Sequence, residues 1–322
     1  MTDILHYNEI KKIIPLNKSL IPIIEEGFIN LSKNKTVTPP IMRLDIEEFY
    51  GEADVKAAYI KGLDSFAIKI AVGYFNNPSK GLPSSGGLMV LLNSETGVIK
   101  AILLDQGYLT DVRTAIAGAI ASKYLSNLDI ENVGIIGSGM QAQLQLESLM
   151  MVRNPKTVYV WARDQAKADK YIKTMKMKIN VNFINSKNIQ ELCKNCQILI
   201  TTTPSDKPLI KNDWVKKGTH ITAMGSDAEH KNEIDPLIIR NCDSYVPDKQ
   251  SQTIILGELH HAIKNGLINK DKKFNELGEI INNPTLGRKS NDDITICDLT
   301  GTGVQDTAIA RHTYNLFISN KI

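Results

Sequence analysis

The chain has 322 residues, enough for about two domains of ordinary size. Its composition, 42% hydrophobic and 23% charged, is typical of a folded globular protein and excludes an intrinsically disordered chain. The net charge is only +3, the lysines form no basic stripe, and no apolar run approaches about 18 residues, so neither nucleic acid nor a membrane is an expected partner.

The four cysteines and the N-terminus bear on the compartment. Residues 1–6 lack the basic start and apolar core of a secretory signal, so the cysteines favour a reducing cytoplasm. Two of them form a C-x-x-C pair, but no second pair or histidine at metal spacing is near, and no metal site is expected. A redox role stays open beside the plainer interpretation, a chance pair where a helix leads into a buried strand. The cysteines are Cys193, Cys196, Cys242 and Cys297.

The N-terminal part predicts two helices, a group of strands and a further helix. The first 30 or so residues predict one helix and then another, with Ser19 and Pro22 suited to the start of the second. Thr110 can cap a long alanine-rich helix over about residues 111–125. Apolar runs bounded by turn residues predict the strands between these helices. The strands are expected at residues 66–72, 88–92 and 98–104, with a hairpin turn at 93–97.

After Asn127 the pattern becomes an alternation of short strands and helices. The strands are nearly all apolar, which is typical of a parallel sheet that helices cover on both faces. The expected fold class is therefore α/β with a doubly wound parallel sheet, and a last helix is expected over about residues 303–319. Strands are expected at residues 133–136, 157–161, 181–183, 197–202 and 220–224.

A glycine-rich turn follows the first of these strands and opens a helix. In a G-x-G-x-x-A turn the first glycine makes the tight bend, the second lets a pyrophosphate approach the backbone, and the small third residue lets helix and strand pack closely. The helix N-terminus then offers free N–H groups to the phosphates. This context predicts an NAD or NADP site. The turn consists of Gly137, Ser138, Gly139, Met140, Gln141 and Ala142.

The next strand ends near the residues that would face the adenosine ribose of the cofactor. Arg163 could bind a 2′-phosphate, which favours NADP, while Asp164 could reach the ribose hydroxyls, which favours NAD. Arg163 could equally be a solvated loop charge. The sequence leaves NAD and NADP open.

Several separated stretches, in order along residues 36–312, resemble the ornithine cyclodeaminase/mu-crystallin family. Residues 51–56, together with residues 107–114, look most like the branch that contains ectoine-utilisation relatives and iminosuccinate reductase. The stretches are Gly81-Leu82-Pro83, residues 109–115, the glycine turn, Thr201-Thr202-Thr203-Pro204, Gly225-Ser226-Asp227 and residues 298–306.

The resemblance implies a fold and a kind of chemistry. It implies a substrate-binding and homodimerisation domain of mixed α/β structure from residues 1–123 and 301–322, with a Rossmann domain inserted over residues 124–300. Members of the family act on small α-amino or α-imino acids. Some cyclise ornithine to proline and recycle NAD within one turnover, while others reduce imines or oxidise amino acids.

By resemblance, Arg43, Lys69 and Arg113 form a clamp for the substrate carboxylate, and Thr114 adds a hydroxyl. Lys69 lies within an apolar strand and Arg113 in the first turn of an apolar helix, where a cation is usually paired or bound to a ligand. An arginine fork fits a carboxylate with two hydrogen bonds. Asp227 corresponds to an aspartate that faces the substrate nitrogen, where an anion would stabilise an iminium and could move a proton. It could also be a turn residue.

Two positions depart from the cyclodeaminase pattern. Asp54 stands where those relatives carry a glutamate that activates water, so the shorter acid puts that catalytic role in doubt. Lys56 stands where they tend to have methionine. A cation at this point could bind a second carboxylate and would repel the ammonium of ornithine, although Lys56 could also lie on a solvated strand face.

The remaining expected site residues follow from strand ends and a helix start. Ligands of open α/β sheets bind at the carboxyl ends of the strands, and a helix N-terminus attracts anions. Thr202, Thr203 and Pro204 stand at a strand end and are expected to face the cofactor. By resemblance, Gly225 and Ser226 also belong to the cofactor site, and Thr302 and Gly303 open the last helix near the substrate.

The expected function is an NAD(P)H-dependent reductase of a small imino acid, with a dicarboxylic, iminosuccinate-like acid as one candidate substrate, or an amino-acid dehydrogenase in reverse. One alternative is an ornithine cyclodeaminase. Another, of a different class, is a mu-crystallin-like protein that binds a cofactor or ligand without turnover.

Overall fold

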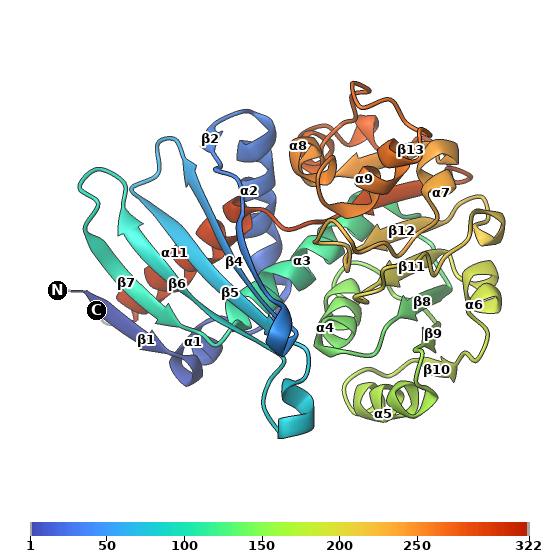
Figure 1. Cartoon of the computed structure of the whole chain (residues 1–322), viewed down its shortest axis with the longest axis horizontal. Helices are drawn as coiled ribbons and strands as arrows, with labels where there is room; N and C mark the ends of the chain where they lie inside the picture. The colour runs from blue at the N-terminus through green and yellow to red at the C-terminus, as the bar shows by residue number, and fades with distance from the viewer. Residues whose placement is uncertain (1, 321–322) are drawn as a thin grey trace. The chain divides into compact units, whose positions relative to one another are not determined.

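The computed structural model describes residues 2–320, which form two compact units (Figure 1). The first unit comprises the chain up to Arg113 and again from Thr302, and the second comprises Thr114–Gly301. The second unit is therefore an insertion in the sequence of the first. The boundary between Arg113 and Thr114 falls inside helix α3 (Tyr108–Leu125).

The first unit is built on a seven-stranded sheet in the order β1-β7-β6-β5-β4-β2, with β3 also paired to β4. Its pairings are antiparallel except for β1, which runs parallel to β7. The strands are β1 (Asp3–His6), β2 (Thr36–Val37), β3 (Met42–Ile46), β4 (Gly51–Ile60), β5 (Ser65–Tyr74), β6 (Ser85–Asn93) and β7 (Ile99–Leu104).

Helices of this unit cover one face of its sheet. Figure 1 shows α11 crossing behind β4–β7, with α2 beside it. Because strand side chains alternate between faces, Ala67 and Lys69 are buried beneath α11, whereas Ile70 on the opposite face is 39% exposed. The helices are α1 (Tyr7–Ile13), α2 (Ile21–Ser32) and α11 (Gly303–Ser319), with short 3₁₀ turns η1 (Lys18–Leu20), η2 (Glu47–Phe49) and η3 (Asn77–Lys80).

The second unit is a seven-stranded sheet in the order β10-β9-β8-β11-β12-β14-β13, with every pairing parallel. This confirms the α/β class and the doubly wound parallel sheet. The strands are β8 (Asn132–Ile136), β9 (Thr157–Trp161), β10 (Asn182–Asn185), β11 (Ile198–Thr201), β12 (His220–Ala223), β13 (Ser244–Pro247) and β14 (Thr295–Asp298).

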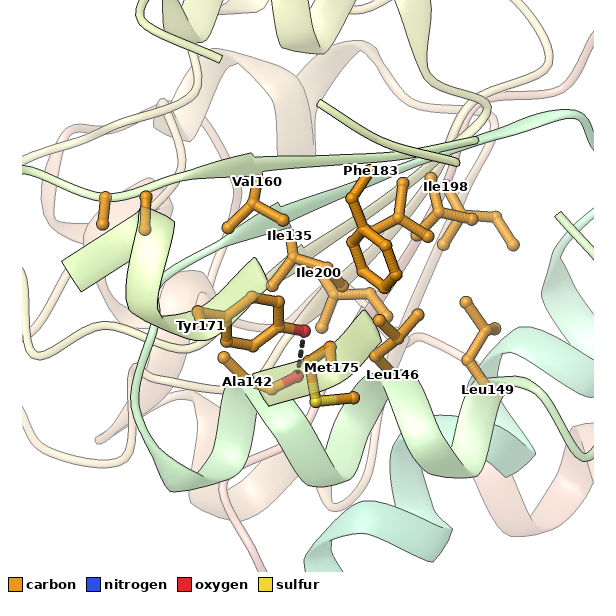
Figure 2. Close-up of a cluster of buried hydrophobic side chains, with 14 of the residues drawn as sticks. Ile135, Ala142, Leu146, Leu149, Val160, Tyr171, Met175, Phe183, Ile198 and Ile200 are labelled. Atoms are coloured by element: carbon orange, nitrogen blue, oxygen red, sulfur yellow. Dashed lines mark hydrogen bonds between the residues drawn. The ribbon is translucent and has the colours of Figure 1, made fainter. Parts of the chain in front are cut away.

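Apolar side chains from strands and helices interlock in this unit. In Figure 2, Ile135, Val160 and Ile200 of three strands pack against Leu146, while the Tyr171 hydroxyl donates a hydrogen bond of 3.0 Å to the carbonyl of Ala142. The helices are α4 (Met140–Leu149), α5 (Gln165–Lys176), α6 (Ile189–Asn195), α7 (Pro236–Asn241), α8 (Gln250–Thr253), α9 (Gly257–Lys264) and α10 (Leu277–Asn282), with 3₁₀ turns η4 (Asn212–Trp214) and η5 (Pro284–Leu286).

Local features differ from the expectations in three places. Strand β1 precedes the first expected helix, and β13 and β14 extend the second sheet. Helix α3 begins at Tyr108, so Thr110 lies inside its first turn; the buried carboxylate of Asp105 instead accepts a hydrogen bond of 2.8 Å from the N–H of Leu109. None of the helices within residues 2–320 combines the length and apolar character needed to span a bilayer.

Candidate functional site

The glycine turn of the second unit has the geometry of a phosphate-binding loop. Gly137 has a φ of +127°, and a Cβ there would lie 2.3 Å from the Thr202 hydroxyl, so only glycine fits. A Cβ on Gly139 would meet no atom within 4 Å, which leaves open space where a pyrophosphate would approach.

Helix α4 presents its N-terminus at this turn. Its N-cap, Gly139, provides no side-chain hydrogen bond, so the first N–H groups remain available to an anion. Ala142 is fully buried and holds the helix against the sheet, whereas Met140 is 59% exposed. The expected residues therefore fit a dinucleotide phosphate site.

The residues after β9 divide between structure and solvent. Asp164 caps helix α5, with its carboxylate accepting a hydrogen bond of 3.0 Å from the N–H of Ala166. Arg163 is exposed. Asp164 is thus engaged in a local role that the sequence did not indicate, while Arg163 is free to meet a 2′-phosphate.

The ends of β11 and β12 bring the remaining expected cofactor residues together. The Thr202 hydroxyl donates to the carbonyl of Ile136 at 3.3 Å, and Ser226 is buried with its hydroxyl 2.5 Å from the carbonyl of Lys231. Thr203 and Gly225 both donate N–H groups to the buried carboxylate of Glu233. Pro204, which follows Thr203, is exposed.

Asp227 forms an ion pair within the same unit. Its carboxylate lies 2.7 Å from the ammonium of Lys231, and its side chain is 39% exposed. Lys231 is buried, with 6% of its surface exposed. Sequence reasoning missed Lys231, whose only local signal is its position four residues after Asp227.

A buried cluster in the first unit contains Lys69, Arg113 and a carboxylate that sequence reasoning missed. Asp306 is fully buried on the first turn of α11, with its two oxygens 3.0 Å from Arg113 Nε and 3.3 Å from Lys69 Nζ. Burial would raise the pKa of Asp306, but Arg113, Lys69 and Lys56 outweigh it and the pKa is lowered.

The attachment of α11 to the sheet fixes Asp306 in this position. The neighbouring Thr307 hydroxyl donates to the carbonyl of Ala58 on β4 at 2.7 Å and accepts from the N–H of Ala67 on β5 at 3.0 Å. A Cβ on Gly303 would lie 2.4 Å from the carbonyl oxygen of Ala57. Gly303 therefore serves close packing of α11 on β4.

Lys56 extends the cluster across the sheet. It pairs with Lys69 in the register of β4 and β5 and is 7% exposed. Burial, followed by the charge of Arg113, lowers the pKa of Lys69 to about 7, and Lys56 adds to this effect. A lysine with this pKa can both donate and accept a proton near neutral pH.

A second buried acid, Asp105, lies within electrostatic range of Lys69. Burial raises its pKa to about 6, while hydrogen bonds from the N–H groups of Leu109 and Gly107 and the charge of Lys69 oppose the rise. The cluster therefore gathers three buried basic side chains, Lys56, Lys69 and Arg113, of which Lys69 and Arg113 share the carboxylate of Asp306.

Arg43 and Asp54 lie on the same face of the sheet and belong to an ionic group of their own. The Arg43 guanidinium contacts Glu52 at 2.5 Å, Asp45 at 2.9 Å and Asp54 at 3.5 Å. Because β3 and β4 form a hairpin, these acids are supplied locally. Direct binding of substrate by Arg43, or activation of water by Asp54, remains a prediction.

Two further expected substrate residues lie at unit boundaries in the sequence. Thr302 is buried, and its N–H donates to Gln305 Oε1 at 2.8 Å; the same oxygen accepts from Arg113 at 3.3 Å. Thr114 is partly buried, and its carbonyl accepts from Gln145 at 3.0 Å.

Among the described residues, neither the cysteines nor side chains of metal-binding type form a second candidate site. Burial raises the pKa of Cys193 to about 12, and all four thiols are free. No group of three or more histidine, cysteine or acidic side chains in residues 2–320 is arranged to hold a metal ion.

A family model that spans residues 1–321 matches this chain, and its description is the ornithine cyclodeaminase/mu-crystallin family. The chain belongs to the ornithine cyclodeaminase/mu-crystallin family. This confirms the resemblance found in the sequence. Within the family, the chain is 51% identical over 308 residues to an uncharacterised cyclodeaminase of Sinorhizobium fredii, covering 95% of this chain and 93% of that protein.

Relatives that are named for an activity act on imino acids or amino acids. The chain is 30% identical to iminosuccinate reductase of Paracoccus denitrificans over 91% of its length and 90% of the reductase. The solved dimer of an archaeal alanine dehydrogenase with bound NAD has a TM-score of 0.90 and 32% identity, covering all of this chain and 97% of that one. Members of the ornithine cyclodeaminase/mu-crystallin family thus include nicotinamide-dependent oxidoreductases as well as cyclodeaminases.

Proposed function

We propose that this protein is an NAD(P)H-dependent reductase that converts a small imino acid to the α-amino acid, and that it runs as an amino-acid dehydrogenase in reverse. The buried cluster of Lys56, Lys69 and Arg113 around Asp306 carries the proposal, because Lys69 and Arg113 share a single carboxylate and an arginine fork suits the carboxylate of a substrate. The relatives named alanine dehydrogenase and iminosuccinate reductase support the same class of reaction.

The second unit supplies residues that fit the cofactor. Gly137, Gly139 and the N-terminus of α4 would hold the pyrophosphate, and the ends of β11 and β12 would hold the nicotinamide half. When bound, the reduced nicotinamide supplies the hydride. The exposed Arg163 favours NADPH, whereas the NAD-bound relative favours NADH, so both cofactors belong in the assay.

The cluster residues would divide binding and proton transfer between them. Arg113 would bind the substrate carboxylate through its fork, while Asp306 holds both Arg113 and Lys69 in place. Lys69, with a pKa near 7, would give a proton to the reacting substrate in reduction and take one back in oxidation. Asp227 of the second unit would stabilise the positive charge of the imine nitrogen.

We propose that Lys56 determines selectivity for substrates with a second carboxylate. We expect Lys56→Met to reduce kcat/KM for a dicarboxylic imino acid by about 100-fold, as expected for a lost buried ion pair of about 3 kcal/mol. The reduction for a monocarboxylic substrate should be no more than about threefold. Steady-state kinetics with oxaloacetate plus ammonia and with pyruvate plus ammonia measure both values. Equal losses would remove Lys56 as the specificity determinant.

The second candidate function is an ornithine cyclodeaminase. Glu52, Asp54 and Asp45 all contact Arg43, and acidic side chains on this face of the sheet would suit the distal ammonium of ornithine. The 51% identical relative, named a cyclodeaminase, also supports this candidate.

One pair of assays separates the two functions. A reductase consumes NADH or NADPH, seen as a loss of absorbance at about 340 nm, when glyoxylate, pyruvate or oxaloacetate is supplied with ammonia. A cyclodeaminase forms proline and ammonia from ornithine with no net change in the cofactor. Proline formation without imine reduction would overturn the reductase proposal.

We also propose that the protein is a homodimer that acts in the cytoplasm. The sheet face opposite α11 exposes Met42, Leu44 and Ile70, an apolar surface typical of an interface, and the archaeal relative is a dimer. The free thiols fit a reducing compartment.

Ile70→Asp tests the interface. A buried unpaired charge in a two-fold interface is introduced twice, so we expect the variant to elute as a monomer by size-exclusion chromatography with light scattering. Leu128→Asp is the matched control, because Leu128 is 80% exposed in the second unit and should leave the dimer intact. A dimeric Ile70→Asp protein would contradict this choice of interface.

A further inference from the structure

One buried glutamate of the second unit ties together the loops that follow two neighbouring strands. Oε1 of Glu233 accepts hydrogen bonds from the N–H of Thr203 at 2.6 Å and from its hydroxyl at 2.7 Å. Oε2 accepts from the N–H of Gly225 at 2.8 Å and from the Thr201 hydroxyl at 2.6 Å. Thr201 is the last residue of β11, Thr203 lies in the loop after it, and Gly225 lies in the loop after β12.

The two loops meet tightly at this carboxylate. A Cβ on Gly225 would lie 2.2 Å from the carbonyl oxygen of Thr203 and 2.6 Å from Oε2 of Glu233, so the position admits only glycine without a shift. Glu233 is fully buried, and burial raises its pKa while the four donors oppose that rise.

Hydrogen bonds also hold the backbone of Glu233 in place. Its N–H donates to Oε1 of Glu258 at 2.8 Å, and its carbonyl accepts from the N–H groups of Leu209 at 2.7 Å and Ile210 at 3.1 Å. Glu258 is also fully buried. The carboxylate that joins the loops therefore projects from an anchored segment and holds them at a set position.

The strand order of the sheet indicates which half of a bound dinucleotide these loops would contact. The glycine turn follows β8, and Arg163 follows β9, on the adenosine side. Strands β11 and β12 lie on the other side of β8. Because a dinucleotide crosses the carboxyl ends of the strands at this reversal, the loops after β11 and β12 face the nicotinamide half.

We propose that Glu233 is a positioning residue for the nicotinamide half of the cofactor. It preorganises Thr203 and Gly225 without touching the ligand, so that binding does not have to order two separate loops. The inference rests on the proposed function, which requires a nicotinamide cofactor in this unit, and adds the residue that sets how its reactive half is held.

The test compares two nucleotides that share the adenosine half. Titration calorimetry gives the Kd of NADH and of ADP-ribose, which lacks nicotinamide, for the wild-type protein and for Glu233→Gln. An amide keeps the size of the side chain but turns one acceptor oxygen into a donor that faces the existing donors. We expect the Kd of NADH to rise at least about tenfold and that of ADP-ribose to change by less than about twofold.

Glu258→Gln is the matched control. It replaces a neighbouring buried carboxylate by an amide whose oxygen can still accept the hydrogen bond from the N–H of Glu233, so the anchor is kept; it disturbs the contact with Asn232 and none of the four loop donors. An equal rise for both nucleotides in Glu233→Gln, no rise for either, or the same selective loss in Glu258→Gln would overturn the inference.

A second variant covers the case in which Glu233→Gln fails to fold. Thr201→Val removes one of the four donors at nearly constant volume and should weaken NADH about threefold with ADP-ribose unchanged. The same selectivity criterion then decides. A wild-type protein that binds neither nucleotide would contradict the proposed function itself, and this inference with it.

Discussion

Replacing Lys69 by methionine is expected to reduce kcat/KM for amino-acid oxidation by about 10³-fold, because the change removes both a cation of the carboxylate site and the group proposed to move the proton. Methionine fills a similar volume beneath α11, so the fold should be kept. The Kd of NADH should stay within about twofold, since the proposed cofactor residues lie in the second unit.

The control for this variant is Lys100→Met. Lys100 also lies on the sheet of the first unit, but its ammonium pairs with the exposed Asp64 at 2.7 Å. Its loss should change kcat/KM by less than about twofold. Full activity in Lys69→Met would remove Lys69 from the mechanism.

The pH dependence of kcat/KM for amino-acid oxidation also tests the role of Lys69. Lys69, with its pKa lowered to about 7, is charged below that pH and becomes a neutral base above it, so kcat/KM for oxidation should rise through about pH 7. Lys69→Arg keeps the charge but does not titrate in this range, and the rise should disappear. Asp105→Asn tests whether that acid, with a pKa near 6, causes the rise instead.

Asp306→Asn is expected to lower the free energy of unfolding by about 3–5 kcal/mol, because it leaves Lys69 and Arg113 buried without their shared countercharge. The loss of Asp306 should also shift the pKa of Lys69 further below 7, since Asp306 raises it in the intact protein. Urea unfolding measures the first effect and the pH profile of oxidation the second.

Asp64→Asn provides the comparison for Asp306→Asn. Asp64 pairs with Lys100 and Arg311, but its side chain is 62% exposed, so its loss should cost less than about 1 kcal/mol. An Asp306→Asn protein as stable as Asp64→Asn would show that Asp306 does not hold the cluster together.

The second unit was predictable in outline because its central strands, such as β11 and β12, are buried on both faces. Residues 133–136 are apolar and lead directly into the glycine turn, residues 157–161 are mostly apolar, and the structure has β8 and β9 there. Strands β13 and β14 were harder to recognise, because their four-residue sequences mix apolar residues with serine, threonine, proline or aspartate.

The first unit depends more on pairings between distant residues. Asp3–His6 is a strand because it pairs with β7 in parallel register, with Leu5 opposite Leu103. The four residues have mixed polarity and give no local signal for this pairing. Its two following helices could be predicted from local signals such as Pro22, which lies in the first turn of α2.

The candidate site was predictable where a residue is unusual in its own surroundings. Lys69 stands out in an apolar strand and Arg113 in an apolar helix, and the structure brings both to Asp306. Asp306 was missed because its partners lie about two hundred residues away in sequence. The ion pairs of Arg43 with Glu52 and Asp54 were not predicted, because the pairing of β3 with β4 brings these acids beside it.

The burial of the native thiols has a practical consequence for chemical labelling. The pKa of Cys196 and Cys297 is also raised by burial, and that of Cys242 is raised to about 12, so almost no thiolate exists at neutral pH. A cysteine introduced at the exposed position of Leu128 would react with a maleimide in preference to all four. A single fluorophore could therefore be attached without first removing any native cysteine.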